Sequence, residues 1–155
     1  MLSVPAAGNA LILGDCLRDA SVVTPELFRT VIAIACRRFP SHGQSEKAAR
    51  IERLIGVNAW TEATLALIEL ELPQWQLRRI AYDDGEWYCA LSRERELPEW
   101  LDQSIEAHHT NFALALLSAF VEAQQLAAAS SGPSVPSARS TLSPLVATPC
   151  LSSIR

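Results

Sequence analysis

The strongest metal-binding pattern in the chain is a run of three side chains that precedes the last helical segment. Asp102, Glu106 and His109 are spaced at i, i+4 and i+7, which places them on one side of a helix if residues 98–109 are helical. Glu106-x-x-His109 also has the spacing used by carboxylate-bridged di-iron bundles. Such bundles need a second Glu-x-x-His pair, and the sequence has none. We therefore expect a solvated helix face here, with no metal and no cofactor.

His108 is a candidate general base. In the same predicted helix it falls on the apolar side, together with Trp100 and Ile105. A buried neutral imidazole held by one hydrogen bond is the simpler interpretation. The alternative is a catalytic histidine in a ligand-binding pocket, with Trp100 and the hairpin residue Trp87 as walls. The two interpretations differ in whether the core opens beside His108, and the sequence leaves that question open.

Cys36 is the second catalytic candidate. Arginines at positions 37 and 38 follow it, and a positive neighbourhood lowers the pKa of a thiol. A thiol mechanism also needs a nearby histidine with an orienting partner, and no local signature of one accompanies Cys36. The four cysteines show no CxxC spacing, so we expect reduced thiols, mostly buried, in a cytoplasm.

Composition and charge argue against nucleic-acid and membrane partners. The 155-residue chain has a formal net charge of −4. Its adjacent arginines, Arg78 and Arg79, point to opposite faces of a predicted strand with acidic neighbours, so they form no single basic patch. The sequence contains no run of about 20 apolar residues, the length that spans a bilayer. Gly-rich phosphate loops, GxSxG and HExxH motifs are absent from it as well.

Helical periodicity organises most of the chain. Residues 1–23 lack a sustained period and are expected to form a flexible N-terminal arm. Thr24-Pro25-Glu26 marks a helix start, with threonine as N-cap and proline at the first helical position. Residues 24–129 are expected to form a single α+β domain, and residues 130–155 a disordered Ser/Pro-rich tail. The predicted helices cover residues 24–39, 45–55, 59–72, 98–109 and 111–128.

Residues 75–92 are predicted to form a two-stranded antiparallel β-hairpin that turns at Asp83-Asp84-Gly85. A two-residue Asp-Gly loop would place Arg78 opposite Leu91. A three-residue loop with Gly85 in the left-handed conformation gathers most apolar side chains on one face, with Arg79 as the single misfit, and we favour it. The predicted apolar face comprises Trp75, Leu77, Ala81, Trp87, Cys89 and Leu91.

Three motifs stand between Leu67 and His109. They are Glu-Leu-Pro-Gln-Trp at 71–75, Tyr-Asp-Asp-Gly-Glu-Trp at 82–87 and Leu-Ser-Arg at 91–93. With them, a stretch from about residue 20 to residue 127 resembles a family of small uncharacterised proteins of rhizobial-type bacteria. The motifs are typical of a helix end and a hairpin. The resemblance therefore implies a bacterial source and no particular activity.

These patterns predict an α+β fold in which about five helices pack around one antiparallel two-stranded β-hairpin. We expect a small non-catalytic protein-interaction or regulatory module, with a small enzyme or ligand-binding protein as the alternative. The expected partner is a second copy or another protein, because an isolated hairpin leaves both strand edges open. The last helix is apolar nearly all round, which is typical of a central helix or of a subunit interface.

Overall fold

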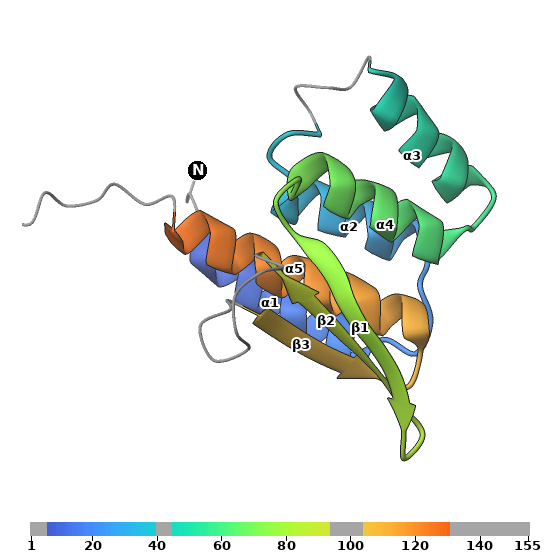
Figure 1. The fold of residues 1–155 in the computed structure, drawn as a ribbon. Helices are drawn as coiled ribbons and strands as arrows, with labels where there is room; N and C mark the ends of the chain where they lie inside the picture. The colour runs from blue at the N-terminus through green and yellow to red at the C-terminus, as the bar shows by residue number, and fades with distance from the viewer. Residues whose placement is uncertain (1–5, 40–44, 94–103, 131–155) are drawn as a thin grey trace, which may run out of the picture.

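A computed structural model describes residues 6–39, 45–93 and 104–130 of the chain. These residues form five helices and a three-stranded antiparallel sheet, so the fold is α+β (Figure 1). In chain order the elements are α1 (Ala6–Asp19), α2 (Pro25–Ala35), α3 (Glu46–Gly56), α4 (Trp60–Glu71), β1 (Gln76–Asp83), β2 (Glu86–Ser92), β3 (Ser104–His109) and α5 (Phe112–Ser130).

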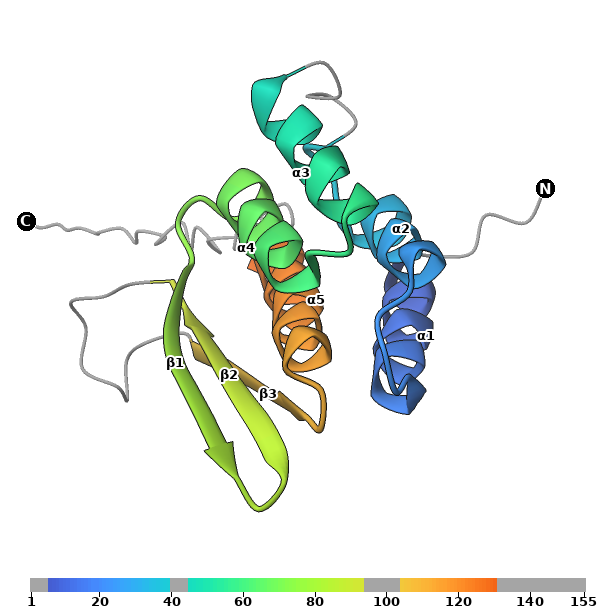
Figure 2. The same cartoon turned by 90° about the vertical axis from the view of Figure 1, so that its right-hand side faces the viewer.

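Helix α5 lies at the centre of the molecule. The sheet packs on one side of it, and α1 and α2 lie on the other side (Figure 2). Helix α4 also contacts α5, while α3 packs against α4. Among the described helices, α5 has the one segment, Phe112–Ala129, that is long and apolar enough to cross a membrane, a test that core helices also meet. Its contacts on two sides account for the apolar composition.

Side-chain caps mark the starts of three helices, and the predicted cap at Thr24 is confirmed. Thr24 and Ser45 each accept a hydrogen bond from the backbone N–H three residues later, at 3.1 and 3.2 Å. The Asn111 side chain accepts from two N–H groups in the first turn of α5. Each cap satisfies donors that have no partner inside the helix, so the local sequence fixes where these helices begin.

Residues 6–19 form a helix where the sequence predicted a flexible arm over residues 1–23. Leu13 and Leu17, one turn apart in α1, are at most 1% exposed and belong to the core. The sequence obscures this period because Leu11 and Ile12 are apolar but lie 69% and 60% exposed on the other side of the helix. Helix α1 is therefore an integral part of the packed structure.

Residues 104–109 form strand β3, where the sequence predicted part of a helix over 98–109. The first part of that predicted helix, residues 98–103, lies outside the described residues. Strand β3 pairs antiparallel with β2, so the predicted two-stranded hairpin is part of a three-stranded sheet. The segment alternates with a period of two, since Ile105 and Ala107 pack against the core while the residues between them are exposed.

The turn between β1 and β2 contains two residues, Asp84 and Gly85, with Asp83 opposite Glu86. Both turn residues have positive φ, 50° and 85°, as a type I′ turn requires. The favoured three-residue loop is therefore wrong. Asp-Gly is the sequence that tolerates two left-handed residues in succession, and this local preference determines the turn.

A β-bulge in β1 removes the objection to the two-residue turn. The register shifts between Leu77 and Arg79, so Leu77 lies opposite Leu91 and Arg78 is the extra residue. Between the bulge and the turn, Ile80 and Tyr82 share a face with the apolar residues of β2, and Ala81, predicted there, lies on the other face.

A buried carboxylate joins α2, α4 and α5. Glu71, the last residue of α4, is 5% exposed and accepts hydrogen bonds from the backbone N–H groups of residues 37–39 at 2.6 to 3.0 Å. Gln124 of α5 donates to the same carboxylate at 3.1 Å and to the Ala35 carbonyl at 2.8 Å. Helix α2 ends at Ala35, short of its predicted end at residue 39, and the N–H groups beyond it bind Glu71.

Replacing Glu71 with alanine will lower the free energy of unfolding by about 3 kcal/mol, because three backbone N–H groups and Gln124 lose a charged acceptor. Urea unfolding followed by circular dichroism measures the loss. The matched control is Glu69→Ala, whose side chain is 64% exposed and pairs with Lys47 at 3.8 Å; its cost will be below about 1 kcal/mol. Equal losses in the two variants would contradict the anchoring role of Glu71.

Replacing Gly85 with alanine will cost about 1 kcal/mol of stability, because the residue must keep a positive φ. No atom lies within 4 Å of a Cβ built there, so the cost comes from the backbone alone. Gly56→Ala is the control, since Gly56 is equally open and has no positive φ. Thermal unfolding compares the two, and an unchanged midpoint for Gly85→Ala would refute the turn assignment.

Candidate functional site

The structure separates the predicted metal ligands. Glu106 and His109 are three residues apart on strand β3, so they point to opposite faces of the sheet, whereas a helix would have aligned them. His109 is 8% exposed, and its Nδ1 accepts the Asn111 N–H at 2.9 Å in the turn that leads into α5. Asp102 lies outside the described residues. Within the described ranges, no group of three or more ligating side chains comes together.

His108 lies on the exposed side of the sheet rather than in the core. Its side chain is 59% exposed, and its Nδ1 is 3.1 Å from Oε2 of Glu86. The imidazole also stacks on Tyr88, the residue directly opposite in β2, with ring centroids 5.5 Å apart. Because strand alternation replaces helical periodicity, His109 is the buried histidine and His108 the accessible one.

The structure does not bring His108 and Trp87 together. Trp87 points to the helix side of the sheet, where its ring packs against Phe112 at 5.1 Å and against Tyr82 at 4.9 Å. The sheet therefore lies between Trp87 and the imidazole of His108. Trp100, the other predicted wall of the pocket, lies outside the described residues.

The face of the sheet that bears His108 carries mainly negative charge. Arg79 and Glu106 pair across it at 3.9 Å, with both side chains at least half exposed. The pKa of Tyr88 is raised, first by desolvation and then by nearby carboxylates, of which Glu86 contributes most. This face offers charged and hydrogen-bonding side chains.

The buried thiols are poor nucleophiles. Burial, followed by the negative charge of Glu71, raises the pKa of Cys36 well above its usual range. The sequence predicted the opposite shift from Arg37 and Arg38. In the structure their backbone N–H groups bind Glu71, which places a carboxylate near the sulfur. Burial likewise raises the pKa of Cys89 to about 11.

A cleft of about 190 Å³ lies between strand β3 and helices α1 and α5, and we call it the edge cleft. Leu17 and Val121, both at most 2% exposed, contribute apolar surface to it. Desolvation raises the pKa of Glu122, and the charges of Arg18 and His108 oppose that shift, so these groups are close enough to interact. The remaining lining residues are Gly14, Glu106, Ala107, Ser118 and Gln125.

The edge cleft lies beside an edge of the sheet. The strand order is β1-β2-β3, so β3 ends the sheet that the described residues form. The site could not be predicted as long as residues 104–109 were read as part of a helix. The available signal was the alternation of Ile105 and Ala107 with polar neighbours, over a length typical of a strand.

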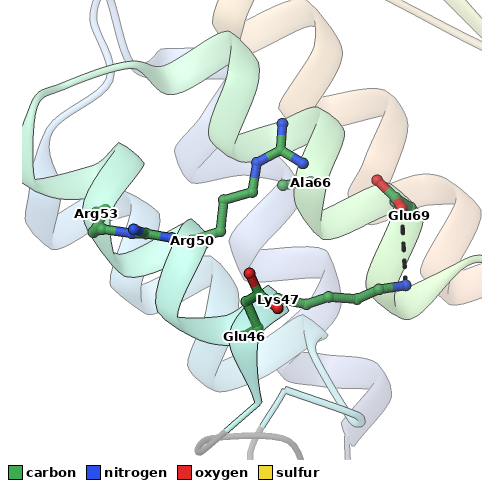
Figure 3. A pocket seen from close by; sticks show the side chains of 6 residues that line it. All are labelled: Glu46, Lys47, Arg50, Arg53, Ala66 and Glu69. Atoms are coloured by element: carbon green, nitrogen blue, oxygen red, sulfur yellow. Dashed lines mark ion pairs between the residues drawn. The ribbon is translucent and has the colours of Figure 1, made fainter.

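A second groove, of about 180 Å³, lies between α3 and α4 (Figure 3). Lys47 reaches Glu69 at 3.8 Å, and Arg50 extends from α3 toward Ala66 of α4. The paired side chains are 63% and 64% exposed, and such surface pairs contribute little. The groove brings cations to an open surface and provides no nucleophile or histidine among its lining residues.

Comparisons with known proteins identify no relative. A scan against models of protein families, a search of curated proteins and a search of solved structures each gave no match. The resemblance to small rhizobial-type proteins therefore stays a prediction.

We expect iodoacetamide to modify Cys16 in the native protein while sparing Cys36 and Cys89, because Cys16 is exposed and the other two are buried with raised pKa values. Peptide mass spectrometry identifies the modified sites. All three will react after denaturation in urea. Modification of native Cys36 at the rate of Cys16 would show that its thiol is accessible and activated after all.

Proposed function

We propose that this protein is a non-catalytic interaction module that binds an extended segment of a partner chain along the outer edge of β3. The observation that carries the proposal is the position of the edge cleft directly beside that strand. A segment added to an edge strand gains main-chain hydrogen bonds, and pockets beside the edge receive its alternate side chains. The cleft supplies apolar surface from Leu17 and charged groups from Arg18 and Glu122.

The other edge of the sheet, β1, is less suited to strand addition. Its register is broken by the bulge at Arg78, and bulges and charged side chains are devices that discourage pairing at an edge. Strand β3 pairs with β2 in an unbroken register from Ser104 to His109. Of the two edges in the described sheet, β3 is therefore the better template.

The enzyme alternative has weaker support. His108 lines the edge cleft, but its side chain is 59% exposed. The imidazole is already engaged by Glu86 and Tyr88. We also propose that the protein is bacterial and works in the cytoplasm. The free thiols of Cys16, Cys36 and Cys89 support that location, since an oxidising compartment would favour disulfides.

The test uses a displayed library of random octapeptides selected on the immobilised full-length protein. The discriminating variant is Gly14→Leu, which fills the edge cleft from α1. A Cβ at Gly14 meets no atom within 4 Å, and a helix interior favours leucine over glycine, so the variant will fold. We expect it to weaken binding of selected peptides by about tenfold or more. Isothermal titration measures the change.

The matched control is Gly56→Leu, at an equally open position on α3 away from the cleft, which will bind like the wild type. A selected peptide carrying N-methyl groups at alternate residues will also lose affinity, because it cannot form the main-chain ladder. Failure to select any peptide, or equal binding by both glycine variants, would overturn the proposed function.

A further inference from the structure

We propose that the segment bound at this edge is strand β3 of a second copy of the chain, paired antiparallel about a two-fold axis that passes through Ala107. This inference rests on the proposed function, because it names the occupant of the same edge. The polar side chains that β3 directs to the exposed face of the sheet are Ser104, Glu106 and His108.

Charge selects the register of this pairing. Directly opposite residues in an antiparallel pair share a face, so the axis must pass through a residue position if the helices of both copies lie on the same side. An axis at Ala107 places Glu106 opposite His108 of the second copy, and this contact occurs twice. An axis at Glu106 would oppose two carboxylates, and an axis at His108 would oppose two imidazoles. Opposite charges across a strand pair stabilise it and like charges destabilise it.

The dimer would also place the two β1 edges, which their bulges protect from further pairing, on the outside of the sheet. Joining the two β3 strands makes one continuous sheet whose outer strands are the two copies of β1, each carrying its bulge. A closed two-fold dimer leaves no further pairing edge of the β3 type. Ala107, 4% exposed and directed toward the helices, brings only a methyl group to the axis.

Each imidazole would then lie between two carboxylates. Nδ1 of His108 already faces Glu86 at 3.1 Å, and the second nitrogen would be available to Glu106 of the other copy. The other groups near His108 are Tyr88 on β2, Glu106 on β3, Glu122 on α5 and Arg18 on α1.

Sedimentation velocity of the full-length chain at about 1 to 100 µM tests the inference. The wild type will be dimeric at the upper concentrations. His108→Glu opposes two carboxylates at each contact and will raise the dimer dissociation constant by about tenfold or more. The double substitution of Glu106→His with His108→Glu exchanges the two charges, restores the facing pairs and will recover the association. Lys47→Glu, which also replaces a basic side chain by a carboxylate but on the exposed surface of α3, is the control and will dimerise like the wild type.

A wild type that stays monomeric over this range would overturn the inference, as would dimerisation of His108→Glu with wild-type affinity. Loss of association in the exchanged variant, with circular dichroism showing a native fold, would overturn the register. The octapeptide selection repeated on His108→Glu separates the two proposals. Peptides that bind this variant in the edge cleft preserve the proposed function even if no dimer forms.

Discussion

Glu71 places a carboxylate in the interior, where a charge is tolerated only with hydrogen-bonding partners around it. It obtains those partners from the backbone beyond α2 and from Gln124 of α5. One side chain at the end of α4 therefore fixes where α2 stops and how α5 lies against both helices. The sheet packs on α5 in turn, so its position depends indirectly on this buried carboxylate.

The central position of α5 also creates the candidate site. The helix packs against β3 on one side and against α1 on the other, and its residues Ser118, Glu122 and Gln125 line the gap between these two elements. A helix that merely covered the sheet would leave the strand edge exposed to open solvent. Here α1 adds a second wall, and the edge of β3 becomes one side of a cleft lined by side chains of mixed character.

The sequence predicts the elements whose signals are local. The caps at Thr24 and Ser45 and the turn at Asp84-Gly85 depend on residues only a few positions away. The predicted loop length is wrong because the sequence of one strand does not reveal the bulge at Arg78. Helix α1 and strand β3 depend on tertiary contacts, and their apolar residues also fit other periods. The sequence does not predict that Glu71 is buried, because nothing in its neighbourhood reveals that three distant N–H groups need an acceptor.

The error in period at residues 104–109 changed the chemistry assigned to two histidines. In a helix, His108 would be buried and Glu106 would align with His109; in a strand, Glu106 and His108 share the exposed face and His109 turns inward. The strand thus separates Glu106 from His109, and it brings a carboxylate and an imidazole, two residues apart, onto one face of an edge. A carboxylate and an imidazole that alternate on such an edge are complementary to their own antiparallel copy, because reversing the strand direction exchanges the two positions. The same alternation that overturned the predicted site is therefore the property that makes self-recognition the best-supported use of this edge.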